Sequence, residues 1–136
     1  MTKFEIKSRV RNQFFEITDE VRKAVAASGV TSGVCVVYCP HTTAAITVNE
    51  NADPEVVQDM LHYLNAAVPK ENPAFRHAEG NSDSHIKASL VGPSVMLIVE
   101  GGDLVLGRWQ GVYFCEFDGP RTRTVAVQVS GARVVG

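Results

Sequence analysis

The sequence contains no uninterrupted apolar run of about 18 residues or more, the length that a membrane-spanning helix requires. Residues 1–5 alternate polar and apolar side chains and lack the continuous apolar segment of a secretory signal peptide. The 13 lysines and arginines do not outnumber the 15 aspartates and glutamates, so the positive charge typical of a general nucleic-acid binder is missing. We therefore expect a soluble, cytoplasmic protein that has neither a membrane nor a nucleic acid as its partner.

Cysteine is also scarce, since Cys35, Cys39 and Cys115 are the only three. Their odd number and apolar surroundings argue against the disulfide framework of a secreted domain. Cys35 and Cys39 could form half of a metal site, but no second closely spaced pair accompanies them. The favoured interpretation is that all three are small, buried hydrophobic residues.

What is present is enough apolar sequence for one compact core. The chain has 136 residues, of which 45% are hydrophobic, and it contains no repeat or linker, so we expect a single domain over residues 1–136. Alternating or continuous apolar patterns predict strands over residues 4–10, 14–17, 34–39, 41–49, 95–99, 104–106, 112–117 and 124–129. Segment 14–17 is expected to extend or pair with the first strand. Segment 34–39 is apolar at both its odd and its even positions, which predicts a strand covered on both faces.

Two or three helices are expected between these strands. The first begins with Thr18 as a plausible N-cap and ends at Gly29, which suits the position after the last helical turn. Its packed side is expected to include Val21, Ala24, Val25 and Ser28, which repeat at the helical period. A short third helix has Asp83 as its cap, with Ile86 and Leu90 facing the core.

Asp53 and Pro54 predict the start of the middle helix, since a capping residue is followed by a proline at the first helical position. His62 falls on its polar side and is therefore expected to be a solvated helix residue. The apolar side of this helix consists of Val56, Val57, Met60, Leu61 and Leu64.

Three other histidines lie in polar stretches that a folding core does not require. His41 lies in segment 40–43, whereas His77 and His85 flank segment 80–84. Imidazole binds divalent metals and transfers protons near neutral pH, so the convergence of three would make a reaction centre. His85 would also lie in the first turn of the short helix, where backbone N–H groups favour an anion such as phosphate.

The strand after His41 predicts a floor for a ligand. Alternate residues from His41 to Asn49, including Thr43, share one face and are small or polar, whereas Ile46 and Val48 point the other way. Short side chains beside a histidine leave room for a ligand and offer hydrogen-bonding groups. The alternative is an ordinary strand surface that faces solvent.

Two groups near the C-terminus could complete a site. Trp109, the only tryptophan, lies beside Gln110 and could form a wall for a flat heterocycle, or it could be a buried residue in a bulged strand. Arg121 and Arg123 follow the turn at 118–120 and are two positions apart, so in a strand they share one face, as a phosphate clamp requires. Exposed arginines at a hairpin mouth would give the same pattern.

Three ordered motifs, in segments 41–54, 79–92 and 107–111, together resemble the YjbQ-like family, whose members are described as secondary thiamine-phosphate synthases. The resemblance covers nearly the whole chain. It implies an α+β fold with a two-layer, sandwich-like antiparallel β core and flanking helices, and it implies a homotrimer. It also implies a weak transferase activity that joins a pyrimidine pyrophosphate to a thiazole phosphate and releases pyrophosphate.

The resemblance and the charge of the reaction together assign roles to individual residues. The expected metal ligands, for zinc or magnesium, are His41, His77 and His85. The expected catalytic residues are His41, Asn49, Glu50 and Lys87. The expected contacts to a small phosphorylated substrate are Thr43, Asp53, Trp109, Gln110 and Arg121. The chain departs from the family at Arg108, where a threonine is common.

Two other functions fit the same residues. One is a metal-dependent hydrolase of a phosphoester or carbonyl substrate, in which the histidines activate water. The other is a non-catalytic module that recognises a phosphorylated metabolite through Trp109 and Arg121.

Overall fold

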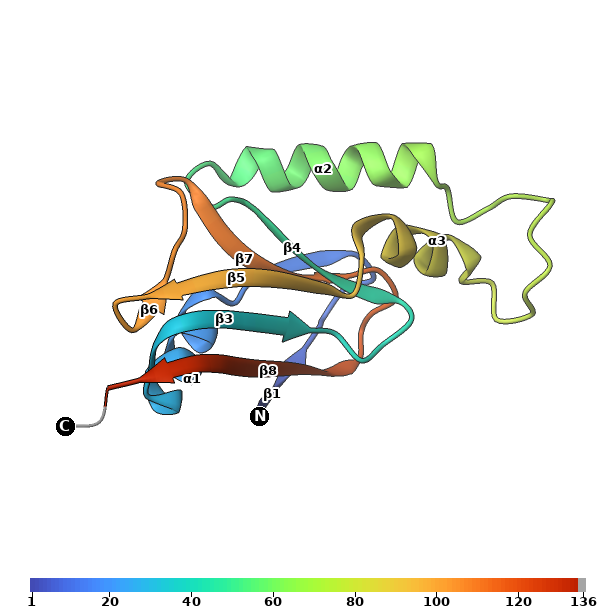
Figure 1. Ribbon diagram of the computed structural model, residues 1–136. Helices are drawn as coiled ribbons and strands as arrows, with labels where there is room; N and C mark the ends of the chain where they lie inside the picture. Colours follow the sequence, from blue (N-terminus) through green and yellow to red (C-terminus); the bar gives the residue numbers. More distant parts are fainter. Residues whose placement is uncertain (135–136) are drawn as a thin grey trace.

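The computed structural model describes residues 1–134, which form eight strands and three helices (Figure 1). The strands make two antiparallel sheets, so the predicted α+β fold with a two-layer antiparallel core is confirmed. The predicted domain, residues 1–136, includes two residues that lie outside the described part. Within that part, no helix combines the length and the apolar character needed to cross a membrane.

The larger sheet contains five strands and the smaller sheet contains three. In spatial order, the strands of the larger sheet are β1 (Thr2–Lys7), β8 (Thr122–Arg133), β3 (Val30–Tyr38), β5 (Ser94–Glu100) and β6 (Asp103–Leu104). The strands of the smaller sheet are β2 (Gln13–Glu16), β7 (Gln110–Glu116) and β4 (Ala44–Glu50). Each predicted strand overlaps one of these strands, although the ends differ.

Segment 14–17 joins the smaller sheet and does not pair with the first strand. Phe15 of β2 lies opposite Phe114 of β7, whereas Phe4 of β1 lies opposite Val125 of β8. The predicted pairing is therefore wrong. The bend at residues 10–12 carries the chain from one sheet to the other.

The main core lies between the two sheets and against helix α1 (Thr18–Ser28). Val21 and Val25 of α1 are fully buried there, as are Ile46 of β4 and Phe114 of β7. Burial of each such side chain contributes about 1.5–3 kcal/mol to stability. The helical periodicity read from the sequence therefore places the correct face of α1 on the core.

The two ends of α1 differ from each other in how well the sequence predicts them. Gly29 ends the helix in the left-handed region (φ 72°), as predicted. Thr18 is not the N-cap, because the helix begins at Thr18 itself and Ile17 precedes it. The Thr18 hydroxyl instead donates to Glu16 and accepts a hydrogen bond from the Val112 N–H, which fastens the helix to β2 and β7.

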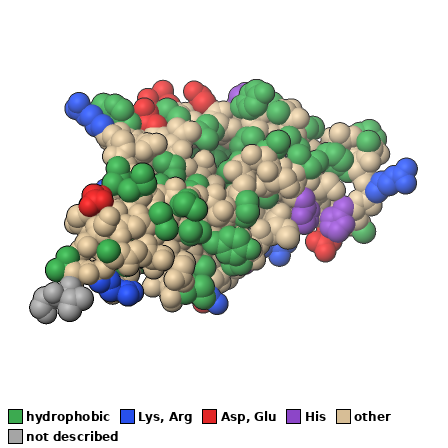
Figure 2. Space-filling view, in the orientation of Figure 1, with side chains coloured by type: hydrophobic (Ala, Val, Ile, Leu, Met, Phe, Trp, Pro, Cys, Tyr) green, Lys and Arg blue, Asp and Glu red, His purple; other side chains and the backbone are tan. Residues whose placement is uncertain are grey.

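The outer face of the larger sheet is open in this chain. Cys35 and Val37 of β3 are buried, but Val34 of the same strand is exposed. On the neighbouring β5, Met96 is 71% exposed and Ile98 is 60% exposed. Figure 2 shows hydrophobic side chains gathered on this face. The prediction that segment 34–39 is covered on both faces does not hold within one chain.

The cysteines behave as the sequence predicts. Cys35, Cys39 and Cys115 are all buried, and none of them forms a disulfide in the described part of the chain. Burial raises the pKa of the Cys35 thiol to about 11, so this thiol stays protonated at neutral pH.

Helix α2 (Pro54–Ala67) lies along the outer side of the smaller sheet (Figure 1). Asp53 caps it, since its carboxylate accepts a hydrogen bond from the Glu55 N–H at 2.9 Å, as predicted. His62 is exposed, also as predicted. The five apolar residues of this helix named above are all half-buried. α2 therefore covers the sheet without burying any residue completely.

Helix α3 (Ser82–Val91) contradicts the prediction from its periodicity. Ile86 and Leu90 were expected to face the core, yet they are 38% and 66% exposed. The buried residues of this helix are Asp83, Ser84, Lys87 and Ala88. Asp83 is not the N-cap either, because Asn81 occupies that position. An ion-pair network, described below, holds the polar side of α3 against the protein.

Candidate functional site

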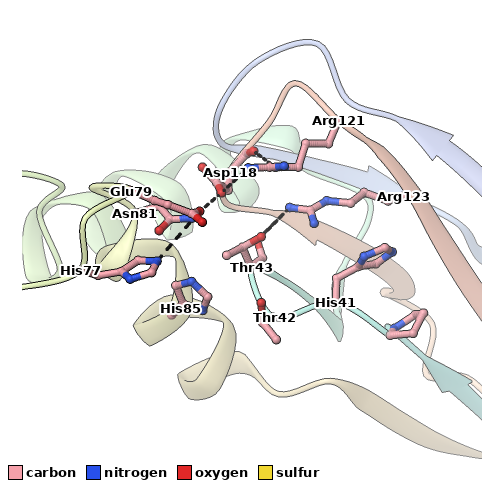
Figure 3. Close-up of a pocket in the computed structure, with 11 residues that line it drawn as sticks. His41, Thr42, Thr43, His77, Glu79, Asn81, His85, Asp118, Arg121 and Arg123 are labelled. Atoms are coloured by element: carbon pink, nitrogen blue, oxygen red, sulfur yellow. Dashed lines mark hydrogen bonds and ion pairs between the residues drawn. The ribbon is translucent and has the colours of Figure 1, made fainter.

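A pocket of about 490 Å³ opens where the β3–β4 loop, the β7–β8 turn and the start of α3 meet (Figure 3). The three predicted histidines, His41, His77 and His85, all line it. Its other lining residues are Pro40, Thr42, Thr43, Glu79, Asn81, Asp118, Arg121 and Arg123. Thr43 and both arginines of the predicted clamp, Arg121 and Arg123, are therefore brought together with the histidines.

The wall formed by the strands rests on a buried ion pair. Arg123 of β8 is 4% exposed and donates from Nε to the Glu116 carboxylate at 2.8 Å. Arg123 Nη2 also donates to Thr43 Oγ1, and Ser8 Oγ donates to Glu116. Burial by itself raises the pKa of Glu116, but the hydrogen bonds from Arg123 and Ser8 outweigh it and hold the pKa below its usual value. The hydrogen bonds of these side chains are made to one another, so they fix the shape of the wall.

His41 is also held by a hydrogen bond. Its Nε2 accepts from the Thr124 backbone N–H at 2.9 Å. Burial, and then the charge of Arg123, lower the pKa of His41, so the ring is neutral at pH 7. In a neutral ring that accepts at Nε2, the proton resides on Nδ1. His41 therefore has an N–H donor at Nδ1, and its Nε2 lone pair is already engaged.

The β7–β8 turn contributes a carboxylate shared by two side chains. Asp118 Oδ2 accepts from Arg121 Nη2 at 3.0 Å and from Asn81 Nδ2 at 2.8 Å. The bond to Asp118 fixes the orientation of the Asn81 amide, so its Oδ1 is an acceptor. Asn81 is 6% exposed, and within residues 1–134 this Oδ1 has no hydrogen-bond partner. A buried acceptor beside a pocket is open to a hydrogen bond from a ligand or from water in that pocket.

The opposite wall carries His77 and His85. Their ring centroids are 5.6 Å apart and their planes are nearly perpendicular. His77 Nε2 lies 3.9 Å from a carboxylate oxygen of Glu79. Apart from this long contact, the two imidazole rings face each other and the pocket, as Figure 3 shows. Neither ring makes a side-chain hydrogen bond within residues 1–134.

Only two of the three histidines are neighbours. The ring centroids of His77 and His85 lie 5.6 Å apart, a separation that two imidazole ligands of one zinc ion can have. His41 does not complete the set in this arrangement, because its Nε2 accepts from the backbone. In residues 1–134, no three histidine, cysteine, aspartate or glutamate side chains are grouped to hold a metal. Joint metal binding by the three histidines therefore stays a prediction.

Lys87 lies outside the pocket. Its Nζ donates to Asp83 at 3.0 Å and to Asn65 of α2 at 2.7 Å, and the side chain is 1% exposed. Arg11 donates twice to the same Asp83 carboxylate, both at 2.8 Å. Burial raises the pKa of Asp83, but Arg11 and Lys87 outweigh it and lower the pKa to about 2. This network anchors α3, and with it His85, to the rest of the chain. The structure does not bring Lys87 into the pocket, and its catalytic role stays a prediction.

Five further predicted site residues lie at the other end of β4. Asn49 pairs with Gly111 and Glu50 pairs with Gln110, whereas the pocket is at the start of the strand. A strand of seven residues spans roughly 20 Å. These five residues, none of which lines the pocket, are Asn49, Glu50, Asp53, Trp109 and Gln110. The structure does not bring them together with the histidines, and their roles in catalysis and substrate binding stay predictions.

The exposure of Trp109 contradicts one of the two interpretations of the sequence. Trp109 is 54% exposed, so it is not a buried strand residue. The guanidinium of Arg108 lies 4.7 Å above its ring centre, in a cation–π contact. The residue that departs from the family pattern thus covers the tryptophan.

The predicted polar floor of β4 is wrong. Ala45 is fully buried and packs in a second cluster with Ala88 of α3 and Phe117. Thr43 reaches the pocket only because it precedes β4 and lies beside Arg123. The face that the alternation identified as a ligand floor is covered by α2 and α3.

The pocket residues that sequence reasoning missed include Glu79, Asn81 and Asp118. Glu79 and Asn81 lie between His77 and His85, in a polar segment without periodicity. That lack of periodicity was the signal that could have identified both residues. Asp118 was explained by its turn, and nothing local distinguishes a turn aspartate from one that also binds Asn81 and Arg121.

The fold and the site define an α+β protein with a histidine- and arginine-lined pocket, and comparison with known proteins gives its family. Residues 2–132 match the family described as "UPF0047 protein YjbQ-like". The chain is 52% identical over 127 residues to the UPF0047 protein YugU of Bacillus subtilis, covering 93% of this chain and 96% of that one. A UPF0047 protein of Methanocaldococcus jannaschii is 49% identical over 129 residues, covering 95% and 93%.

Solved structures agree with this assignment. A crystal structure of an uncharacterized conserved protein of the YjbQ/UPF0047 family from Clostridium acetobutylicum has a TM-score of 0.94 and 52% identity. The match covers 96% of this chain and 100% of that one. A hypothetical protein from Aeropyrum pernix K1 has a TM-score of 0.91 and 35% identity, with coverages of 96% and 98%. The chain belongs to the UPF0047 YjbQ-like family, which confirms the family membership that the sequence indicated.

Proposed function

We propose that this protein is an enzyme whose pocket binds a phosphorylated small molecule, and that its reaction is of the thiamine-phosphate synthase type. In this reaction, a pyrimidine pyrophosphate is joined to a thiazole phosphate and pyrophosphate is released. The observation that carries the proposal is the convergence of His41, His77, His85 and Arg121 on one pocket beside the unpaired amide oxygen of Asn81. Residues from three separate segments of the chain meet there, which packing alone does not require.

Arg121 is the cation best placed for a phosphate group. Its side chain is 51% exposed, and its bonds to Asp118 use Nε and Nη2. Nη1 is thus available, within the described residues, to a phosphate oxygen. The charge of Arg123 is balanced by the buried Glu116, so Arg123 shapes the pocket while Arg121 meets the ligand.

The histidines supply the proton chemistry. When the bond between the pyrimidine methylene carbon and the pyrophosphate oxygen breaks, negative charge develops on the leaving oxygen. His77 and His85 can donate hydrogen bonds or a proton to that oxygen, because imidazole is a common general acid in enzymes. His41 contributes a neutral Nδ1–H donor. Alternatively, His77 and His85 would hold a divalent metal, which would then supply the positive charge to the phosphate oxygens in place of their N–H groups.

The proposal is tested by assaying thiamine phosphate and pyrophosphate formation from the two substrates, by mass spectrometry. His77→Ala and His85→Ala should each reduce turnover by about 100-fold or more. His62→Ala is the matched control, because His62 is exposed on α2 and outside the pocket. Full activity in both pocket variants would overturn the proposal.

The same assay separates the two other functions. Release of inorganic phosphate from simple phosphate esters, without need for a second substrate, would indicate the hydrolase. Binding of the pyrimidine pyrophosphate with no product would indicate the non-catalytic module. Metal analysis of the purified protein, and assays with and without a chelator, would show whether zinc or magnesium takes part.

We also propose the homotrimer that the family resemblance implies. The exposed apolar side chains of the larger sheet, Met96 and Ile98 among them, form the kind of surface that subunit contacts cover. Met96→Glu and Ile98→Glu should convert the protein to a monomer in sedimentation velocity. Leu90→Glu, on the exposed side of α3, is the control.

A further inference from the structure

A second hollow, of about 600 Å³, lies directly beside the pocket. The two share His77 and His85, which line both. The rest of this cleft is largely apolar and consists of Ala74, Phe75, Arg76, Ser82 and Ile86. The perpendicular pair of imidazole rings thus separates a polar compartment from an apolar one.

The apolar side chains of the cleft are held in place by the fold. Ile86 points outward because the network around Asp83 holds the polar side of α3 against the protein. Phe75 is half-buried, and its N–H donates to the Asn72 carbonyl at 3.0 Å. The Ala74 N–H donates to the Asn72 side chain at 2.9 Å. These bonds form a turn, and its residue Phe75 lines the same cleft as Ile86.

The shape and chemistry of the cleft limit what can occupy it. Its size falls within the range of small-molecule sites, and its apolar lining disfavours a charged group. Phe75 and the two imidazoles offer flat rings, against which another ring packs edge to face or offset. The guanidinium of Arg76 can stack on the same ring. A molecule that fills both hollows must pass His77 and His85.

We propose that this cleft is the subsite for an uncharged aromatic or heteroaromatic ring that is covalently joined to the phosphate group in the pocket. The inference rests on the proposed function, since it takes the pocket to bind phosphate. It adds that the ring, and not only the phosphate, is recognised, and that Phe75 and Ile86 determine this specificity.

Three probes measured by isothermal titration calorimetry test the proposal: inorganic pyrophosphate, methyl diphosphate and benzyl diphosphate. The first two report on the pocket alone, and the third adds a ring. Benzyl diphosphate should bind at least about tenfold more tightly than methyl diphosphate, because the ring is buried in the cleft.

Variants locate the binding of the ring. Phe75→Ala and Ile86→Ser should each remove most of the tenfold advantage of the benzyl compound while leaving the affinity for pyrophosphate unchanged. Leu90→Ser is the matched control, since Leu90 is an exposed apolar residue of the same helix outside the cleft. It should retain the full advantage. Thermal unfolding of each variant checks that the fold is intact.

The outcomes separate this inference from the proposed function. If pyrophosphate and methyl diphosphate bind but the benzyl group adds no affinity, the ring subsite is wrong and the phosphate pocket stands. An advantage that survives both Phe75→Ala and Ile86→Ser, or that Leu90→Ser also removes, places the ring elsewhere and overturns the inference. If none of the three probes binds, both proposals fail.

Discussion

The two walls of the pocket differ in how far their polar groups are committed to other protein groups. On the strand side, Arg123, Glu116 and Thr43 satisfy one another, and His41 accepts from the backbone. On the side of α3 and its preceding loop, His77 and His85 contact each other and little else. The comparison teaches that the first wall sets the shape of the site, whereas the second carries the groups that remain free to react with a ligand.

The largest expected effect comes from breaking the committed wall. Arg123→Met leaves the Glu116 carboxylate buried without its partner, so the free energy of unfolding should fall by about 3–5 kcal/mol. Urea unfolding followed by circular dichroism measures it. The double variant Arg123→Met with Glu116→Leu should recover part of the loss, since no charge is then buried alone. A loss below about 1 kcal/mol in the single variant would show that the two walls do not differ in this way.

The next effect concerns the anchor of α3 and depends on pH. Because the pKa of Asp83 is lowered to about 2 in the folded protein, its carboxylate stabilises the fold above its unfolded pKa, near 4. This contribution, roughly 2 kcal/mol, should be lost as the pH falls from about 4 through 2. Urea midpoints measured over this range should decline more steeply for the wild type than for Asp83→Asn. Parallel curves would contradict the pKa shift.

A smaller effect is expected at His41. His41→Ala removes the acceptor for the Thr124 N–H, which should lower stability by about 1 kcal/mol. Nitrogen NMR of the wild type at pH 7 should show a neutral ring protonated on Nδ1. Protonation on Nε2 instead would contradict the hydrogen bond and return His41 to the set of candidate metal ligands.

The smallest change in stability belongs to the uncommitted wall. His77→Ala should alter the free energy of unfolding by no more than about 0.5 kcal/mol, because its exposed ring makes few contacts. Its effect on turnover should be large, as proposed above. A variant that loses stability and activity together would remove the distinction between the two walls.

Local sequence signals predicted local structure well. Gly29 ends α1 and Asp53 caps α2 because these roles depend on the conformation and hydrogen bonds of a few neighbouring residues. The apolar periodicity of α1 and α2 identified their packed faces. For α3 the same reasoning failed, since Ile86 and Leu90 are outside and Lys87 is inside. Its orientation depends on Arg11, which lies 72 residues from Asp83 in the chain.

The site shows the same division. The sequence pointed to His41, His77, His85, Thr43 and Arg121, and the structure places all of them at one pocket. Asn81 and Asp118 were missed because their bond joins two turns 37 residues apart, which no spacing rule encodes.

By itself, the sequence determined the α+β class, the caps and periodicity of two helices, the burial of the cysteines and the histidines worth following, because these depend on residue type and near neighbours. Only the tertiary structure decided which sheet β2 joins, which face α3 buries and which end of β4 carries the pocket. The physical reason is that ion pairs and strand pairings between distant segments fix these features, and their energies outweigh the local preference of any one helix or strand.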